Sequence, residues 1–396
     1  MKKLMTIVIT ILFSLTVFAQ TESATIEKAN ELIANKKYES AFKMLQDFDN
    51  KDEKPDIALL KEDIALNYFV TSIMHQMFAF KDLEKDENIM DYRGKNGSFG
   101  MYSFAVDSIL SKLINVYPDN YKLYKGLGDF YYEVQQKYAG QWLKDDKTIS
   151  DLIIKNYQVV IDHKLADDKV YYATGFQFLS MNKNKEAIPY FLKSIELKND
   201  LANAHYNLAY AYLFTDDREN ALKYAKNSLE LYKDAELKCD AARMIGQIYT
   251  ELNDNKNAIE FYEIADKIYP ENYYNLHPLL ALYFKTDNPK KAEMTNSFYN
   301  LAPDKPTIYN DLGNIFYENN KINELIEFYK SKLLIYKDDK KISGNLNFYL
   351  GRLYLDSDKT IAKDYFLTAK SIFTTIFDKN NQVFNVIDEA IKQTKK

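Results

Sequence analysis

The sequence predicts an all-α protein that is built from repeated helix–turn–helix segments. Residues 168–201 and 202–235 are two consecutive copies of one such segment. Small, aromatic and alanine residues recur 34 residues apart in the pairs Gly175 and Ala209, Phe178 and Tyr212, and Ala187 and Ala221. Because one helical hairpin cannot bury its apolar face alone, a fixed period of this length predicts a stack of hairpins.

The period and these residue types resemble the tetratricopeptide repeat, whose first helix carries a bulky residue, then Leu-Gly, then Tyr. The resemblance implies an α-solenoid, a right-handed superhelix of about eight helix–turn–helix repeats that ends in a C-terminal capping helix. Gly or Ala at the eighth position of a repeat lets the paired helix approach closely, and an aromatic at the eleventh fills the space beside it. We expect the regular array to cover residues 168–378 and the capping segment to cover 380–396.

The part of the chain before the regular array follows the pattern less closely. Residues 21–55 have apolar residues at repeat spacing but lack the Leu-Gly step, as an atypical terminal repeat does. Residues 56–167 contain two further repeats. In the first of these, apolar spacing predicts helices over about 56–80 and 102–116.

Both repeats in 56–167 carry an insertion between their helices, at about 81–100 and 135–147. Because equivalent turns line up along one edge of a solenoid, we expect the two insertions to touch. The second insertion includes the segment 138–142, which ends in Trp142, the only tryptophan of the chain. The two insertions are therefore a second candidate site, a surface patch that includes this tryptophan. The alternative is that they only extend the helices and shield the early repeats.

Two later repeats depart from the pattern. Leu280 stands where the small residue belongs, which argues against close helix packing in that repeat, and Leu325 replaces the alanine of the next one. The last amphipathic stretch predicts a helix over 382–393. Its polar residues are expected to solvate the end of the stack.

The N-terminus has the pattern of a secretory signal peptide over residues 1–19. Two lysines precede the apolar run Leu4–Phe18, and small residues then favour cleavage between Ala19 and Gln20. The apolar run is shorter than the roughly 20 residues that a membrane span needs. We therefore expect no membrane span after cleavage, and a periplasmic or secreted protein.

The composition argues against several kinds of ligand. The formal net charge is −5 at pH 7, and the chain has no long block of Lys and Arg, which argues against nucleic acid as a partner. Cys239 is the only cysteine, so the sequence offers neither a disulfide framework nor a thiolate metal site. A small packed thiol is the expected role of Cys239.

The resemblance implies that five positions of each repeat (2, 5, 9, 12 and 13) project into a concave groove lined by first helices. These positions predict a groove that is aromatic in its middle and polar toward the C-terminus, and Tyr274, Tyr317 and Phe348 also occupy them. The predicted partner-binding residues are Tyr172, Phe176, Tyr206, Tyr210, Phe214, Arg243, Gln247, His277, Asn310, Asn314 and Arg352. Aromatic rings with amide and guanidinium groups suit an extended peptide or a partner helix. The alternative for any one ring is packing between neighbouring repeats.

The sequence gives little sign of catalysis. The four histidines fall in four different repeats, without a His-Glu-x-x-His motif or a Cys/His metal spacing. His205 occupies a bulky position of its repeat, where a core histidine is expected. No catalytic residue, metal site or cofactor is predicted.

These observations favour a non-enzymatic adaptor or scaffold of the cell envelope, or a secreted one, that binds a protein or peptide in the groove. A glycan-binding receptor that stacks sugars on the aromatic rings is one alternative. A structural spacer within an envelope complex is another.

Overall fold

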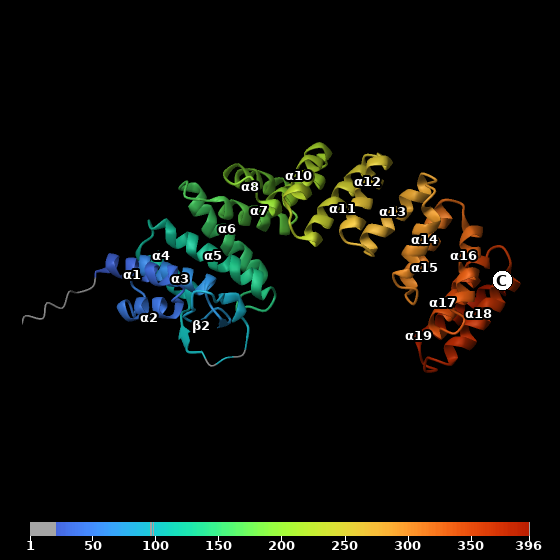
Figure 1. Cartoon of the computed structure of the whole chain (residues 1–396), viewed down its shortest axis with the longest axis horizontal. Helices are drawn as coiled ribbons and strands as arrows, with labels where there is room; N and C mark the ends of the chain where they lie inside the picture. The colour runs from blue at the N-terminus through green and yellow to red at the C-terminus, as the bar shows by residue number, and fades with distance from the viewer. Residues whose placement is uncertain (1–20, 96, 98, 396) are drawn as a thin grey trace, which may run out of the picture. The chain divides into compact units, whose positions relative to one another are not determined.

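The computed structural model describes residues 21–95, 97 and 99–395, so the predicted signal peptide lies outside the described residues. The chain separates into two compact units, one ending at Lys198 and the other beginning at Asn199. In both units successive helices pack as hairpins, as the all-α solenoid prediction requires (Figure 1).

Unit 1 contains four hairpins, of which the second is interrupted by a small sheet. Its helices are α1 Glu22–Ala34, α2 Tyr38–Phe48, α3 Pro55–Asn67, α4 Val106–Val116, α5 Tyr121–Tyr138, α6 Asp146–Asp162, α7 Asp168–Ser180 and α8 Asn184–Leu197. Close packing between paired helices follows from the glycine pattern. A Cβ added to Gly128 on α5 would lie 2.5 Å from the Tyr157 ring on α6, so only glycine fits there.

The helix predicted over 56–80 is wrong in its second half. Helix α3 ends at Asn67, and the chain then forms strands β1 Thr71–Ile73 and β2 Met77–Ala79. After the 3₁₀ turn η1 Ile89–Asp91, strand β3 Met101–Ser103 completes an antiparallel sheet in the order β1-β2-β3. The helix predicted from 102 therefore begins only at Val106.

A distant segment holds the tight turn between β1 and β2. Met74 and His75 in this turn both have a φ of +50°, in the left-handed region that residues other than glycine seldom adopt. The Trp142 Nε1–H donates a 2.7 Å hydrogen bond to the Met74 carbonyl, and the Tyr138 hydroxyl lies 2.9 Å from His75 Nδ1. The second insertion therefore contacts the β1–β2 turn, which lies before the predicted bounds of the first insertion, 81–100. Trp142 is only 8% exposed, so the predicted surface patch around it is wrong.

The first insertion also attaches to the turn between α1 and α2. The backbone N–H of Leu83 donates to the Lys36 carbonyl at 2.9 Å. In return, Lys36 Nζ donates to the carbonyls of Lys85 and Glu87, at 2.7 and 2.8 Å. We call residues 81–95 the strap, because they tie the second repeat back onto the first. Figure 1 shows the strand-bearing segment beside α2.

A buried lysine joins the sheet to the core of unit 1. Lys61 on α3 has no exposed surface, and its Nζ donates to Gln46 Oε1 at 2.5 Å and to the Asp52 carboxylate. The same ammonium lies 5.4 Å from the ring centre of Phe42 and 4.6 Å from that of Phe104, which follows β3. Burial lowers the pKa of Lys61, while the hydrogen bond and charge of Asp52 raise it.

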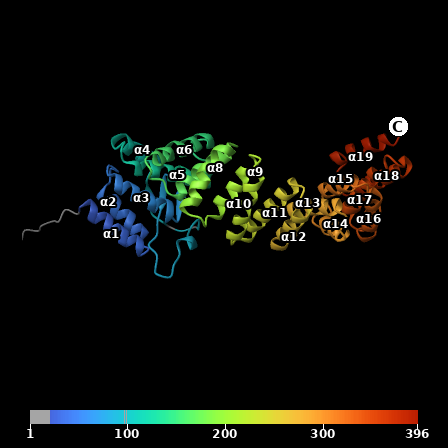
Figure 2. The same ribbon diagram turned by 90° about the horizontal axis from the view of Figure 1, so that it is seen from above.

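Unit 2 continues the hairpins without an inserted sheet. Its helices are α9 Ala202–Leu213, α10 Arg218–Leu231, α11 Ala235–Glu251, α12 Asn255–Ile268, α13 Tyr273–Lys285, α14 Lys291–Asn300, α15 Pro306–Glu318, α16 Ile322–Ile335, α17 Lys340–Tyr354, α18 Lys359–Thr374 and α19 Gln382–Gln393. Figure 2 shows α11 to α14 following one another in chain order. The last helix has the predicted bounds and packs on α18.

The two departures from the repeat pattern change how hairpins pack in unit 2. Leu280 is fully buried among the apolar side chains of α13, α14 and α15. Leu325, also fully buried, takes the place of alanine in the hairpin of α15 and α16. A Cβ added to Gly313 in that hairpin would meet no described atom within 4 Å, whereas one added to Gly351 on α17 would lie 2.6 Å from the Phe366 ring.

Candidate binding site on the first helices

Side chains at equivalent places on consecutive first helices of unit 2 lie against one another. Burial raises the pKa of Tyr206 on α9, and the nearby charge of Asp240 on α11 adds to this while Arg243 opposes it. The Arg243 guanidinium lies 5.6 Å from the ring centre of Tyr274 on α13 and pairs with Asp240 at 2.7 Å. Arg243 therefore connects α11 to α13, and Tyr206 on α9 packs against the core that includes Ile245 of α11.

The connection continues to α17. The Tyr273 hydroxyl on α13 donates a 2.9 Å hydrogen bond to Asp311 on α15. Burial, together with this hydrogen bond, raises the pKa of Tyr273 to about 12. Arg352 on α17 donates from Nη1 to Asn310 Oδ1 on α15 at 3.0 Å. Residues one or two helical turns from these contacts share their face of each helix. We call these side chains the first-helix row: Tyr206, Tyr210, Phe214, Arg243, Gln247, Tyr274, Asn310, Asn314, Tyr317 and Arg352.

The aromatic members of the row are accessible to different degrees. Tyr206 is half-buried, with its ring centre 6.2 Å from that of Tyr232. Tyr210 and Phe214 form an exposed pair with ring centres 4.5 Å apart, and Phe214 is 58% exposed. Tyr274 is 67% exposed. The exposed rings therefore offer apolar surface for contact with a ligand.

The polar members lie beside these rings. Gln247 on α11 is exposed and donates to Glu251 at 3.2 Å. Asn314 on α15 is exposed, one turn after Asn310, and Tyr317 beyond it is 74% exposed. His277 was predicted to line the groove, but it is half-buried between Tyr273 and Phe298, with ring centres 5.6 and 5.8 Å away. Its main contacts are therefore internal to its hairpin.

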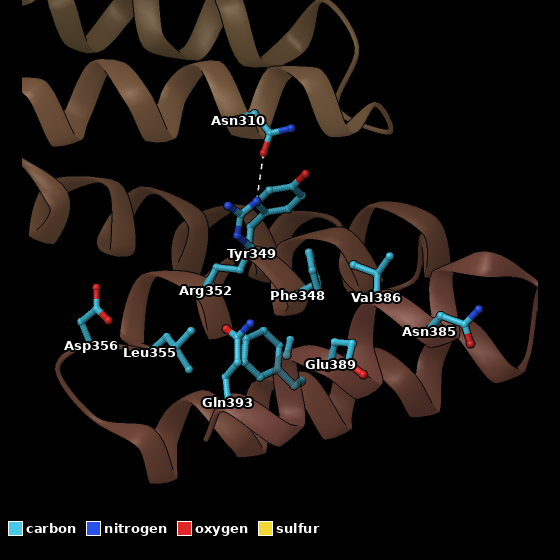
Figure 3. A pocket seen from close by; sticks show the side chains of 12 residues that line it. Asn310, Phe348, Tyr349, Arg352, Leu355, Asp356, Asn385, Val386, Glu389 and Gln393 are labelled. Atoms are coloured by element: carbon cyan, nitrogen blue, oxygen red, sulfur yellow. Dashed lines mark hydrogen bonds between the residues drawn. The ribbon is translucent and has the colours of Figure 1, made fainter. Parts of the chain in front are cut away.

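The row ends in a cleft of about 730 Å³ between α15, α17, α18 and α19, which we call the C-terminal cleft (Figure 3). Its lining includes two predicted residues, Asn310 and Arg352. The half-buried Phe348 adds apolar surface beside the buried rings of Phe366 and Tyr349, and α19 contributes Asn385, Val386, Glu389 and Gln393. The wall formed by α19 was not predicted, because its polar residues were interpreted as solvating the end of the stack. Continuing the 34-residue period into α19 would have placed Val386 and Glu389 at groove positions, but not Asn385 or Gln393.

Two predicted residues, Tyr172 and Phe176, lie on α7 in unit 1. Both are half-buried, with stacked rings whose centres are 6.4 Å apart. The Tyr172 ring also lies 5.9 Å from that of Phe191, a core residue of α8. These rings therefore contribute to the packing of their own hairpin.

The first helices of unit 1 carry a buried carboxyl group. Glu62 on α3 is almost fully buried opposite Gly126 on α5, and this burial raises its pKa well above the usual range. The charges of Asp129 and Asp63 raise it further, whereas Lys125 lowers it. The folded state consequently binds this proton more tightly than the unfolded chain does.

This difference in proton affinity predicts that Glu62→Gln stabilises unit 1 at neutral and alkaline pH. The contribution of Glu62 to the free energy of unfolding is greatest below about pH 4.3, the pKa of this carboxyl in the unfolded chain. It falls as the pH rises toward the pKa of Glu62 in the folded protein. A glutamine at this position does not ionise, so the variant does not lose stability as the pH rises. We therefore expect its free energy of unfolding at pH 8 to exceed that of the parent by roughly 1–3 kcal/mol, the usual cost of an uncompensated buried polar group. Urea denaturation followed by Trp142 fluorescence at pH 4 and pH 8 measures the difference. The exposed Glu27, changed to Gln, is the matched control, and an equal gain at both pH values would contradict the prediction.

The residues considered for chemistry are packed. His205 is buried and its Nε2 lies 2.9 Å from the Asn199 carbonyl, as expected of a core histidine. Cys239 is buried, and burial raises the pKa of its thiol. Within residues 21–95, 97 and 99–395, no cluster of three or more His, Cys, Asp or Glu side chains could hold a metal ion. None of the helices in this part of the chain is long and apolar enough to cross a membrane.

Comparison with known proteins identifies the repeat. The model of the tetratricopeptide repeat matches residues 202–234 and 244–272, which lie in α9 to α12 and the turns around them. Over 181 residues the chain is 26% identical to Protein O-mannosyl-transferase Tmtc3 of Drosophila melanogaster. That alignment covers 45% of this chain but only 19% of the relative, so the chain spans about a fifth of its length.

Solved structures of two bacterial proteins are similar to parts of the chain. A tetratricopeptide repeat protein from Parabacteroides merdae is 16% identical, with a TM-score of 0.41, over 69% of this chain and 99% of that one. A segment of MamA from Desulfovibrio magneticus is also 16% identical, with a TM-score of 0.38, over 46% of this chain and 93% of that one.

Proposed function

Because this chain is a tetratricopeptide-repeat protein, we propose that it is a non-enzymatic scaffold that binds a protein or peptide along the first-helix row. The observation that carries this proposal is the exposure of aromatic rings on consecutive first helices that are held in register. Tyr274 and Tyr317 are 67% and 74% exposed beside the polar contacts that connect α11 to α17. Large rings with neighbouring guanidinium and amide groups are the side chains that dominate binding to proteins.

The mixture of groups in the row favours a polypeptide over a sugar. Arg352 supplies a positive charge, Arg243 an ion-paired guanidinium, and Gln247, Asn310 and Asn314 amides that can both donate and accept hydrogen bonds. A polypeptide offers carboxylates, carbonyls and apolar side chains to such a surface. A glycan would use mainly the rings and amides, and retention on polysaccharide tests that alternative directly.

Truncation of the exposed ring pair is expected to weaken partner binding. A photo-crosslinking residue placed at Tyr210 in cells should capture the partner, which is then identified and purified. We expect Tyr210→Ala and Phe214→Ala each to lower its affinity about tenfold, or about 1.4 kcal/mol, because each removes an aromatic contact. Titration calorimetry with the full chain measures the change.

The matched control is Tyr269→Ala, which removes a tyrosine that is 46% exposed at the end of α12, outside the row. Circular dichroism of all three variants checks that folding is unchanged. If Tyr206→Ala and Tyr210→Ala leave association intact, the chain is a structural spacer. Retention on polysaccharide with no captured protein would support the glycan receptor.

We also propose that the scaffold works in the cell envelope or outside the cell. This location is supported by the two lysines, the apolar run Leu4–Phe18 and the cleavage pattern at Ala19 and Gln20. N-terminal sequencing of the protein from cell fractions tests it. A mature chain that starts at Met1 in the cytosolic fraction would refute the location but not the binding function.

A further inference from the structure

Arg352 differs from the other three arginines in how its charge is balanced. Arg218 and Arg243 form ion pairs with carboxylates, and Arg93 donates to backbone carbonyls. Arg352 is exposed in the C-terminal cleft and has no carboxylate within ion-pair distance among the described residues. Its charge is therefore available to a ligand.

Neutral groups hold this guanidinium in place. Its Nη1 donates to Asn310 Oδ1 at 3.0 Å, and its Cζ lies 5.5 Å from the ring centre of Tyr349. Asp356 follows four residues later, in the turn after α17, whereas Arg352 extends across to α15 (Figure 3). A guanidinium has five N–H donors in a planar fork that matches a carboxylate, so most of its donors remain for a ligand.

The rest of the cleft fits an extended polypeptide main chain. Asn385 and Gln393 on α19 are exposed and make no hydrogen bond with another described residue. A carboxamide can pair with both the N–H and the C=O of an extended peptide. A helical ligand satisfies its own main-chain groups and would leave these amides unused. The cleft chemistry therefore favours an extended segment.

An apolar surface lies next to these polar groups. Phe348 is half-buried, with its ring centre 5.6 Å from that of the buried Phe366, and Val386 on α19 is more than half exposed. Of the two acids in the lining, Glu389 is paired with Lys392 at 2.6 Å, and Asp356 is exposed. The uncompensated positive group of the cleft is thus Arg352, and the uncompensated negative group is Asp356.

We propose that the C-terminal cleft binds an extended segment of the partner protein that carries an acidic side chain next to an apolar one. Arg352 receives the carboxylate, the Asn385 and Gln393 carboxamides bond to the main chain, and the surface of Phe348 and Val386 takes the apolar side chain. This proposal rests on the proposed function, since it describes one end of the same row.

The test uses positional libraries of fluorescein-labelled octapeptides with amidated C-termini, so that side chains are the only carboxylates. Binding to the full chain is measured by fluorescence polarisation. We expect Asp or Glu to be preferred over Asn or Gln about tenfold at one position, as a charge-assisted bidentate pair implies. Arg352→Gln should abolish this preference, and Asp356→Asn should strengthen binding of acidic peptides by removing a like charge. Lys363→Gln on α18, which removes an exposed charge outside the cleft, is the control.

Several results would overturn the proposal: preference for Lys or Arg, no preference at any position, binding that needs a free C-terminal carboxylate, or acid preference that survives Arg352→Gln. The partner protein that is crosslinked at position 210 distinguishes the cleft proposal from the scaffold proposal. If Tyr210→Ala weakens its binding and Arg352→Gln does not, the cleft proposal fails and the scaffold function stands. If nothing is captured and no peptide binds, both fail.

Discussion

Lys61→Ala is expected to destabilise unit 1 by about 3–5 kcal/mol, the usual effect of removing one partner from a buried ion pair. The substitution leaves the Asp52 carboxylate without its cation and Gln46 without its donor. It also removes a buried aliphatic stem whose ammonium lies over the Phe42 and Phe104 rings, which creates a cavity. Urea denaturation followed by the fluorescence of Trp142, which belongs to the same apolar core, measures the loss.

Lys61→Met separates the two causes of this loss. Methionine keeps the length of the stem and removes the charge, so its cost should be less than half that of alanine. Combining it with Asp52→Asn should recover further stability, because no charge is then left unpaired. If Lys61→Ala costs under about 1 kcal/mol, then Lys61 does not hold the sheet to the core.

Gly351→Ala and Gly313→Ala are expected to change stability in opposite directions, although both glycines stand at the eighth position of a repeat. At Gly351 the new Cβ would lie 2.6 Å from the Phe366 ring and 3.1 Å from the Ala362 carbonyl oxygen. Overpacking of this kind costs about 1–3 kcal/mol, more than the helix propensity that alanine adds. At Gly313 no described atom lies within 4 Å, so the gain of roughly 0.5–1 kcal/mol in helix stability should remain.

Thermal unfolding by circular dichroism compares the two variants with the parent. The melting temperature should fall for Gly351→Ala and rise for Gly313→Ala. Gly128→Ala in unit 1, where the added Cβ would meet the Tyr157 ring, serves as a second example of a filled position. Equal destabilisation by Gly313→Ala and Gly351→Ala would mean that the hairpin of α15 and α16 is packed as tightly as its neighbours.

The regular part of the fold follows from residue spacing. The final helix has the predicted bounds, and the resemblance to the tetratricopeptide repeat is confirmed in the segment where the repeat is clearest. Repeat position also identified Tyr274 and Tyr317, which are among the most exposed rings of unit 2. These predictions succeed because each residue of a repeat contacts only its own hairpin and the next one.

The sheet in unit 1 could not be predicted in the same way. Apolar residues continue past Asn67 at spacings that fit either a helix or a strand. The turn that reverses the chain uses Met74 and His75 at positive φ, without the Asn-Gly or Asp-Gly pair that usually marks such a turn. Hydrogen bonds from Trp142 and Tyr138 contribute to holding it, and these lie more than sixty residues away along the chain. No local signal reports a contact of that kind.

The candidate site was predicted unevenly for a related reason. Asn310 and Arg352 were assigned separately from repeat position, and their hydrogen bond shows that they lie side by side. His277 has the right position but stacks within its hairpin, because the neighbouring Tyr273 ring covers it. Position within a repeat indicates which way a side chain points, but packing decides whether it remains accessible.

The strap has a consequence for the order in which the chain folds. In unit 2 the helices contact near neighbours along the chain, so folding can begin at any hairpin and spread. In unit 1 the contacts of Lys36 with the strap join residues 49 and 51 positions apart. A long loop must close before these contacts form, and that entropy loss slows folding. We therefore expect the first two repeats to fold together, after the strap has docked on the turn between α1 and α2.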